Sequence, residues 1–576
     1  MMRDLWDFAM DMSPYGLLCL LLPILCVLAP VEASSEFPVH RLAQYELGNS
    51  LSVGSKVSFV SLEARTLSCV PNVLRKLVIA RIQDVSVSGF NELIQAGIGG
   101  LLLVVPGGDS LPGNVDSVLQ LEEHLLSTDV DIPIYFAPEN EDLLRLMEEL
   151  EREGVSPGST AFQTLMNNIV SSGYQFVTSS SSNSKALPNP GIVTLHGQLS
   201  GRGDEDSLPT ILLVAHYDAS GAAPGMSYGA DSNGSGVTIL MELARLWNKL
   251  YSSSRTHPGY NLVFLLSGGG KINFLGTKKW LEEHQDNDLS SEILSNVAFV
   301  ACLDTLGHEE EGSLYFHVSK PPKEESLAGR FLKHLQNVAH VLNSEININV
   351  VHKKINLAEE ILAWEHERFS IRRLQAFTLS SLASHNVLKR NSILDTKVSM
   401  SLIHQRTRLI AEALACSIYG QLDCNGQLFG GPTLSPNINS ISTFMAYLAS
   451  TSRATSQLVH SGKSNLEGSP KVIQDMAEML KSRSHNFKIL ISKRDKREAE
   501  FTFYDGASTT MNAYKVKPAV FDLFLTLSIS AYLGLLYLIL TRAGYWISLL
   551  KMSSATKKSS TPIKSDMNGN GRIKTH

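Results

Sequence analysis

The stretch "LLVAHYDASG", residues Leu212–Gly221, is the part of the sequence that most directly decides the fold. An apolar run ends in a histidine and an aspartate and then passes into small residues, which is the pattern of a buried strand that runs into a loop. Residues two apart on a strand point the same way, so Asp218 is predicted to lie beside His216 and to orient its imidazole. Taken alone, such a pair more often forms a structural hydrogen bond than a functional site.

The sequence around this stretch repeats the same pattern between residues 190 and 420. Segments typical of buried strands alternate with segments of helical periodicity such as "VTILMELARLW". The predicted strands are Ile192–Leu199, Thr210–His216, Asn261–Leu266, Ala298–Leu303, Ser313–Val318 and Gln375–Leu379. This alternation predicts an α/β fold with a mostly parallel sheet, helices on both faces, and polar chemistry at the carboxyl ends of the strands.

Two further regions flank this domain. Residues 34–185 contain the strand-like runs "LVIARIQ", "GLLLVVP" and "IPIYFAP" between helical segments, which predicts a small N-terminal α/β domain. Residues 421–518 form an extension in which helical patterns are visible but no domain type is. The net charge of −6 argues against nucleic-acid binding, which needs a concentrated basic face.

Both ends of the chain carry apolar segments. Residues 1–33 are typical of a signal peptide, with an apolar core at Leu17–Ala29 and a cleavage site near Ala33, although acidic residues before the core leave an uncleaved anchor as the alternative. Residues 519–541 are apolar over the length of a transmembrane helix, and residues 542–576 form a basic tail, which favours the cytoplasmic side. The predicted topology is single-pass type I, with the bulk of the chain lumenal or extracellular.

The cysteines agree with an oxidising compartment. Four of them lie outside the signal segment: Cys69, Cys302, Cys416 and Cys424. Cys416 and Cys424 are close in sequence, and we expect them to form a disulfide. No CxxC or Cys-His zinc pattern is present.

A glycine-lysine loop follows the strand predicted at Asn261–Leu266, in the sequence "FLLSGGGKINFLGT". A phosphate-binding loop needs Gly-x4-Gly-Lys followed by Ser or Thr. Leu265 stands at the first glycine position and Ile272 follows Lys271, so the phosphate pattern fails at both ends.

The sequence "HYD" followed by "GADSNGSG", residues Gly229–Gly236, resembles the M28-type zinc aminopeptidase superfamily, which also contains transferrin receptor, glutaminyl cyclase and nicastrin. The resemblance spans about residues 190–420 and implies that superfamily's fold. It places His216 at the first metal histidine, Asp218 at its orienting acid and Asp304 at the second metal aspartate. His385 is the candidate for the late histidine, although its spacing to Asp395-Thr396 is longer than in the superfamily. "WEHERFSIRRLQAFTLS", residues Trp364–Ser380, resembles the substrate-side segment.

Three positions of the superfamily's site are changed. The bridging aspartate falls on Ser232, the general base on Gly270 and a terminal zinc ligand on Lys271. Glycine cannot accept a proton, and a lysine cation repels Zn²⁺. The resemblance therefore implies no zinc cofactor and no peptidase activity, with Lys271 expected to pair with Asp231 or Asp304. A single metal held by His216, Asp304 and His385 stays as an alternative.

Asn233-Gly234-Ser235 is an N-glycosylation acceptor sequence. A glycan on Asn233 would sit at the mouth of the former site. The alternative is that Asn233 caps the helix that follows and carries no sugar.

Over essentially its whole length, the chain resembles a nicastrin-related branch of this superfamily in the endoplasmic reticulum membrane. The resemblance implies a non-catalytic scaffold whose partners are the Nodal modulator protein, a small multi-pass transmembrane protein and the translocon that inserts multi-pass proteins, with an indirect effect on Nodal signalling. Two other classes remain open: an active zinc aminopeptidase, and a receptor that binds peptide N-termini without hydrolysis.

Overall fold

A computed structural model describes most of the chain between residues 35 and 516, and residues 523–535, 537–538 and 542. The segments between these limits that lie outside the description are 48–50, 68–72, 108–111, 155–172, 180–183, 205–206, 287–290, 309–311, 343–345, 360, 421–426, 463–465 and 494–500. Residues 1–154 and 174–514 belong to one compact unit, and residues 155–173 and 515–576 belong to a second. The predicted signal peptide, residues 1–33, lies outside the described residues.

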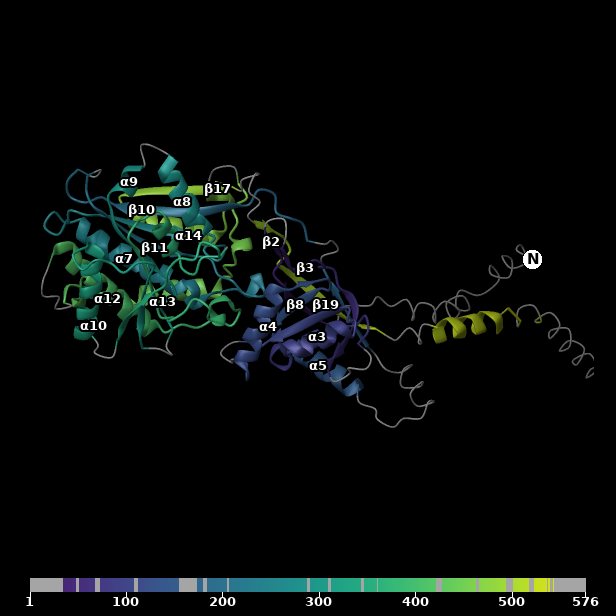
Figure 1. Cartoon of the computed structure of the whole chain (residues 1–576). Coiled ribbons are helices and arrows are strands. Elements are labelled where there is room, and N and C mark those ends of the chain that lie inside the picture. Colours follow the sequence, from purple (N-terminus) through teal and green to yellow (C-terminus); the bar gives the residue numbers. More distant parts are fainter. Residues whose placement is uncertain are drawn as a thin grey trace, which may run out of the picture. The chain divides into compact units, whose positions relative to one another are not determined.

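The centre of the first unit is an eight-stranded mixed sheet of order β15-β14-β16-β13-β11-β12-β10-β17. Figure 1 labels β10, β11 and β17 of this sheet. Its strands are β10 (Gly191–Leu199), β11 (Thr210–His216), β12 (Asn261–Ser267), β13 (Val297–Leu303), β14 (Leu314–Val318), β15 (Ile348–His352), β16 (Ala376–Ser380) and β17 (Asn486–Lys493). The four central strands β12, β11, β13 and β16 run parallel, so their carboxyl ends meet at one edge. The prediction of a mixed, mostly parallel α/β sheet is confirmed.

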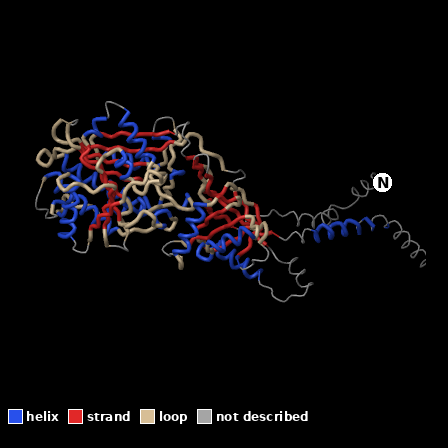
Figure 2. The backbone as a smooth tube through the Cα atoms, in the orientation of Figure 1, coloured by secondary structure: helices blue, strands red, loops and turns tan. Residues whose placement is uncertain are grey.

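Helices cover both faces of this sheet, as Figure 2 shows. The larger core lies on the side of α7 (Gly236–Tyr251), α10 (Leu327–Leu342) and α12 (Met400–Tyr419), and contains Leu213 and Phe264. The opposite core is built on α8 (Leu275–Asp286), α9 (Ser291–Ser295) and α11 (His366–Ile371), and contains Leu212 and Val263. Neighbouring residues of one strand thus enter different cores, which explains why the strands are apolar without alternation.

The N-terminal region is a closed barrel of order β1-β19-β9-β4-β5-β6-β8. Its strands are β1 (Ser35–Arg41), β4 (Ser61–Thr66), β5 (Leu77–Arg81), β6 (Gly100–Val105), β8 (Ile134–Pro138), β9 (Gly173–Thr178) and β19 (Ser508–Val516). The helices are α3 (Val87–Gln95), α4 (Val115–Ser127) and α5 (Glu141–Gly154). Short strands β2 (Tyr45–Leu47), β3 (Leu51–Ser55), β7 (Asp129–Val130) and β18 (Phe501–Phe503) form a separate four-stranded sheet.

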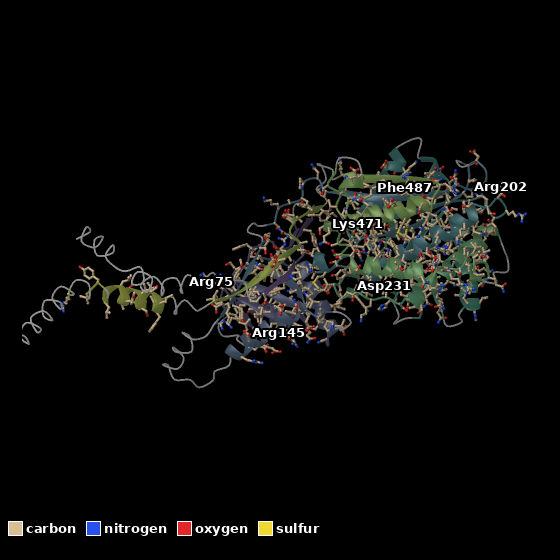
Figure 3. The ribbon with its side chains drawn as sticks, turned by 180° about the vertical axis from the view of Figure 1, so that it is seen from behind. Arg75, Arg145, Arg202, Asp231, Lys471 and Phe487 are labelled. Atoms are coloured by element: carbon tan, nitrogen blue, oxygen red, sulfur yellow. The ribbon has the colours of Figure 1, made fainter. Side chains whose placement is uncertain are left out.

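The region after residue 420 is built into both domains. Its helices α13 (Ile438–Ser450) and α14 (Lys471–Ser482) pack into the larger core, and β17 pairs with β10 at the edge of the main sheet. Figure 3 labels Lys471 on α14 and Phe487 on β17. β19 pairs with β1 and completes the barrel. Residues 421–518, predicted as an extension, therefore supply an edge strand to the main sheet and a strand that completes the barrel.

The predicted transmembrane segment, residues 519–541, is described in part. Residues 523–535 are helical, and large apolar side chains along them are exposed. Among the described residues, no helix is both long and apolar enough to cross a membrane. The span stays a prediction.

We predict that the barrel depends on β19. Met511 is fully buried in the barrel core, whereas Thr509 on the same strand is half-buried. Met511→Ala should lower the free energy of unfolding by about 2–5 kcal/mol because it opens a cavity in that core. Chemical denaturation with Thr509→Ala as the control measures this, and equal effects of the two substitutions would contradict the burial of Met511 in the barrel core.

Candidate functional site: the former metal centre

The carboxyl ends of β11, β12 and β13 bring the predicted residues together. His216 ends β11, Gly270 and Lys271 follow β12, and Asp304 follows β13. The loop before α7 adds Ser232 beside them. Apart from Lys271, which is half-buried, these residues are almost fully buried. The strand-end rule therefore located the site correctly.

Asp218 does not orient His216, contrary to the prediction. Its two carboxylate oxygens accept hydrogen bonds from the backbone N–H groups of Gly270 (2.7 Å) and Lys271 (3.0 Å), and Oδ2 also accepts from the Thr455 hydroxyl (2.6 Å). The carboxylate thus anchors the glycine-lysine loop. Because the N–H groups of Gly270 and Lys271 donate to this carboxylate, they are not available to bind a phosphate group.

The glycine run is required by close packing. A Cβ on Gly270 would lie 2.3 Å from both Cβ and Cγ of His216, and a Cβ on Gly276 would lie 2.3 Å from the carbonyl oxygen of Gly268. Gly269 has a φ of +66°, in the left-handed region that favours glycine. The space that a glutamate side chain would need at residue 270 is occupied by the imidazole of His216.

The partner of His216 is Glu365, a residue that the sequence analysis did not single out. His216 Nδ1 lies 3.4 Å from Glu365 Oε2, and both side chains are fully buried. Glu365 Oε1 accepts hydrogen bonds from the hydroxyls of Ser267 and Thr277, both at 2.6 Å. His216 Nε2 has no hydrogen-bond partner in the part of the chain that the structure describes.

Lys271 points into the site. Its Nζ donates to the hydroxyl of Ser232 at 2.6 Å and to the carbonyl of Arg390 at 3.0 Å. The side chains at two positions that the resemblance assigns to metal ligands are thus hydrogen-bonded to each other. Burial and the nearby Arg390 cation lower the pKa of the Lys271 ammonium to about 8, which leaves it mainly charged at neutral pH.

Asp304 is paired with Arg390, not with Lys271. The guanidinium of Arg390 bonds Asp304 Oδ2 and stacks 4.6 Å from the centre of the Trp364 ring. Burial alone would raise the pKa of the Asp304 carboxyl, but the charges of Arg390, His216 and Lys271 outweigh it and hold this pKa well below its usual range. The predicted Lys271–Asp304 ion pair is therefore replaced by an Arg390–Asp304 pair.

Asp231, the other predicted partner of Lys271, is occupied by the backbone. Its Oδ1 accepts from the N–H of Gly307 at 2.6 Å. Its own N–H and that of Ser232 donate to the carboxylate of Asp395 at 3.0 and 2.8 Å. Burial, and then the neighbouring Asp231, raise the pKa of Asp395 to about 6. Figure 3 labels Asp231 within this domain.

His385 is not brought to the site. Its aromatic neighbour is Trp364, with ring centres 6.5 Å apart, and the side chain is only half-buried. Within the described ranges, no three His, Cys, Asp or Glu side chains are grouped so that they could hold a metal ion.

The residues present do not fit a two-zinc centre. Zinc needs thiolate, imidazole or carboxylate ligands. Here the bridging position is a hydroxyl that already accepts from an ammonium group, and the one retained aspartate is bonded to a guanidinium. A pocket of about 20 Å³ beside Ser232, Thr305 and Arg390 has room for about one water molecule.

The sequence analysis missed Arg390, although a signal was present. The late histidine of the superfamily comes shortly before Asp-Thr, and His385 was noted as too far from Asp395-Thr396. Arg390 lies closer to that pair along the chain, and it is the side chain that reaches Asp304.

Asn233 caps and cross-links the loops beneath the site. Its Oδ1 accepts from the N–H groups of Gly236 and Thr305, both at 3.1 Å, and its Nδ2 donates to the carbonyls of His216 and Leu303. The side chain is fully buried. This geometry corresponds to the helix-capping alternative and leaves no room for the predicted glycan.

The predicted disulfide lies partly outside the description. Cys416 is disulfide-bonded, whereas Cys424 lies outside the described residues, so the pairing stays a prediction. Cys302 is a buried free thiol on β13.

Comparisons with known proteins agree with this architecture. Residues 194–356 match the model of peptidase family M28. The chain is 41% identical to the BOS complex subunit ncln of Danio rerio over 94% of this chain and 96% of that protein. It is 41% identical to the BOS complex subunit NCLN of Homo sapiens, with 91% and 93% covered, and 30% identical to nicalin of Caenorhabditis elegans, with 88% and 90% covered.

Among solved structures, the γ-secretase component nicastrin aligns with a TM-score of 0.59 over 84% of this chain and 100% of that chain, at 12% identity. At this identity the likeness concerns the fold alone.

Gly270→Ala should be destabilising by about 1–3 kcal/mol because its methyl group would overlap His216. In a His216→Gly background the same change should cost less, by at least about 0.5 kcal/mol, since both the Cβ and the ring that the methyl group would overlap are gone. Denaturant unfolding of the four proteins measures this coupling. Gly312, which has open space around its Cβ direction, is the control site for a glycine-to-alanine change. A cost at Gly270 that is independent of His216 would contradict the packing.

The peptide around Asn233 should be unmodified in protein purified from a eukaryotic secretory pathway, because a glycosylated side chain could not make the four hydrogen bonds described. Mass spectrometry with and without glycosidase treatment measures this. A glycan at Asn233 in folded protein would show that the loop before α7 is arranged differently.

Proposed function

The chain belongs to the nicalin family, whose vertebrate members are named BOS complex subunits, and from that premise we propose that it is a non-catalytic, peptidase-like subunit of a membrane complex. The proposal includes residence in the endoplasmic reticulum membrane as a single-pass type I protein. We propose the Nodal modulator protein, a small multi-pass transmembrane protein and the translocon for multi-pass proteins as its partners. An effect on Nodal signalling would then be indirect, through membrane-protein assembly.

The observation that carries the non-catalytic part is the bond between Lys271 Nζ and Ser232 Oγ. Metal-assisted peptide hydrolysis needs an anionic ligand set and a base that takes a proton from the attacking water. At this centre an ammonium and a hydroxyl stand at two ligand positions, and Gly270 stands at the base position with His216 against its Cα. Among the described residues of this centre, no side chain places an unpaired carboxylate at the position of the general base.

The membrane part rests on the apolar segment near the C-terminus. Residues 523–541 carry no Asp, Glu, Lys or Arg, and Asp522 is the one charged residue of the predicted span. The described helical part, residues 523–535, exposes most of its leucines. Exposed apolar surface on a helix is typical of a segment that lies in lipid or against another helix. The basic residues after it favour a cytoplasmic tail.

Affinity purification of the full chain from mild detergent, with metal analysis of the same sample, tests the proposal. We expect the named partners to copurify, zinc to be far below one ion per chain, and peptide hydrolysis in the sample to be unaffected by His216→Ala. Stoichiometric zinc together with hydrolysis that is lost in His216→Ala would instead establish an aminopeptidase. Saturable binding of peptides through their free N-termini, lost in His366→Ala, would establish a receptor.

A further inference from the structure

We propose that residues 388–395 form a plug that closes the former metal centre, and that Glu122 of the N-terminal domain latches this plug in place. We call residues 388–395 the plug segment. The proposal goes beyond membership of a complex, since it concerns how one domain of this chain controls the centre of the other.

The plug segment makes contacts that close the centre from one side. Arg390 supplies its guanidinium to Asp304 and its carbonyl to Lys271 Nζ. Asp395 supplies its carboxylate to the N–H groups of Asp231 and Ser232, and its carbonyl accepts from the N–H of Ala230 at 2.9 Å. Removal of this one segment would therefore take the guanidinium away from Asp304, take one acceptor away from Lys271 Nζ, and leave the N–H groups of Asp231 and Ser232 without their carboxylate acceptor.

The latch comes from α4 of the N-terminal domain. Glu122, which is 2% exposed, accepts hydrogen bonds from the hydroxyl of Ser392, from the N–H of Ile393 at 3.1 Å and from the N–H of Ala222 at 3.2 Å. Two of these three donors belong to the plug segment. Burial raises the pKa of Glu122 to about 7, so this carboxylate depends on its donors for stabilisation in the charged form.

The apolar residues of the plug segment pack against α4, the helix that carries Glu122. Ile393 and Leu394 are buried in a core with Val118, Leu121 and Leu125 of α4. The plug segment thus has an apolar side in the N-terminal domain and a polar side in the former metal centre. A displacement of α4 would withdraw the support for Arg390 and Asp395 together.

Another buried glutamate provides a matched control. Glu412 on α12 is also 2% exposed and accepts from two backbone N–H groups, those of Leu428 at 3.3 Å and Phe429 at 2.7 Å. Both donors belong to one local segment, and neither hydrogen bond involves the plug segment. Glu412→Ala therefore measures how the loss of a buried carboxylate that accepts backbone hydrogen bonds affects the rest of the protein.

Hydrogen exchange read by mass spectrometry on the full chain in detergent tests the latch. In Glu122→Ala, amide exchange should rise by about tenfold or more in the plug segment and at Asp231 and Ser232, since their acceptor Asp395 is freed. Acetylation of Lys271 by an amine-reactive reagent should also become faster, because its Nζ loses the Arg390 carbonyl. Glu412→Ala should accelerate exchange around residues 427–430 and leave these sites unchanged.

Milder variants keep the test decisive if Glu122→Ala does not fold. Glu122→Gln retains an acceptor oxygen and Ser392→Ala removes one donor, so each should give a smaller increase confined to the same amides. Unchanged exchange at the plug segment, Asp231 and Ser232 in all three variants would overturn the proposal, as would an equal increase at these sites in Glu412→Ala. Because the readout is local exchange, it is independent of whether partners copurify or hydrolysis occurs.

Discussion

The ammonium of Lys271 and the guanidinium of Arg390 are the charges on which the centre of this molecule depends. Asp218, Asp231, Asp304 and Asp395 are almost fully buried within one small region, and burial of a carboxylate is costly unless it is paired or hydrogen-bonded. Loop N–H groups satisfy three of these acids, and Arg390 pairs with the fourth. The chain's own cations and amides thereby balance these four acids, of which the resemblance places Asp304 at a metal-ligand position and Asp218 at the position of an orienting acid.

This electrostatic arrangement explains the sequence at the carboxyl ends of the strands. The glycine run after β12 allows the loop backbone to approach His216 and the acid of Asp218, and the lysine at its end reaches across to Ser232. Lys271 and Arg390 are also linked to each other, because the ammonium of one bonds the carbonyl of the other. The cationic centre and the plug segment are therefore one hydrogen-bonded structure, which the N-terminal domain holds through Glu122.

The local hydrophobic pattern of the sequence was sufficient to predict the strands and helices that form from contiguous segments. The strand predicted at residues 210–216 has those bounds in the structure. The rule that sites lie at the carboxyl ends of parallel strands correctly predicted that His216, Lys271 and Asp304 lie close together. β17 and β19 were not recognised, because their role depends on pairing with β10 and β1, which lie hundreds of residues earlier in the chain. Side-chain partners were harder still. Asp218 was assigned to His216 from strand geometry, but the loop amides compete for it more effectively, and the partners Glu365 and Arg390 come from segments that only the tertiary fold places nearby.

The central claim, that two side-chain cations stand where the superfamily holds metal ions, is tested most directly by diffraction data collected above the zinc absorption edge from crystals of the protein grown with zinc. The account predicts no anomalous peak between Ser232 and Asp304, with Lys271 Nζ at the Ser232 hydroxyl and the Arg390 guanidinium at Asp304. An anomalous peak bonded to Asp304 and His216, with Lys271 and Arg390 turned away, would contradict it.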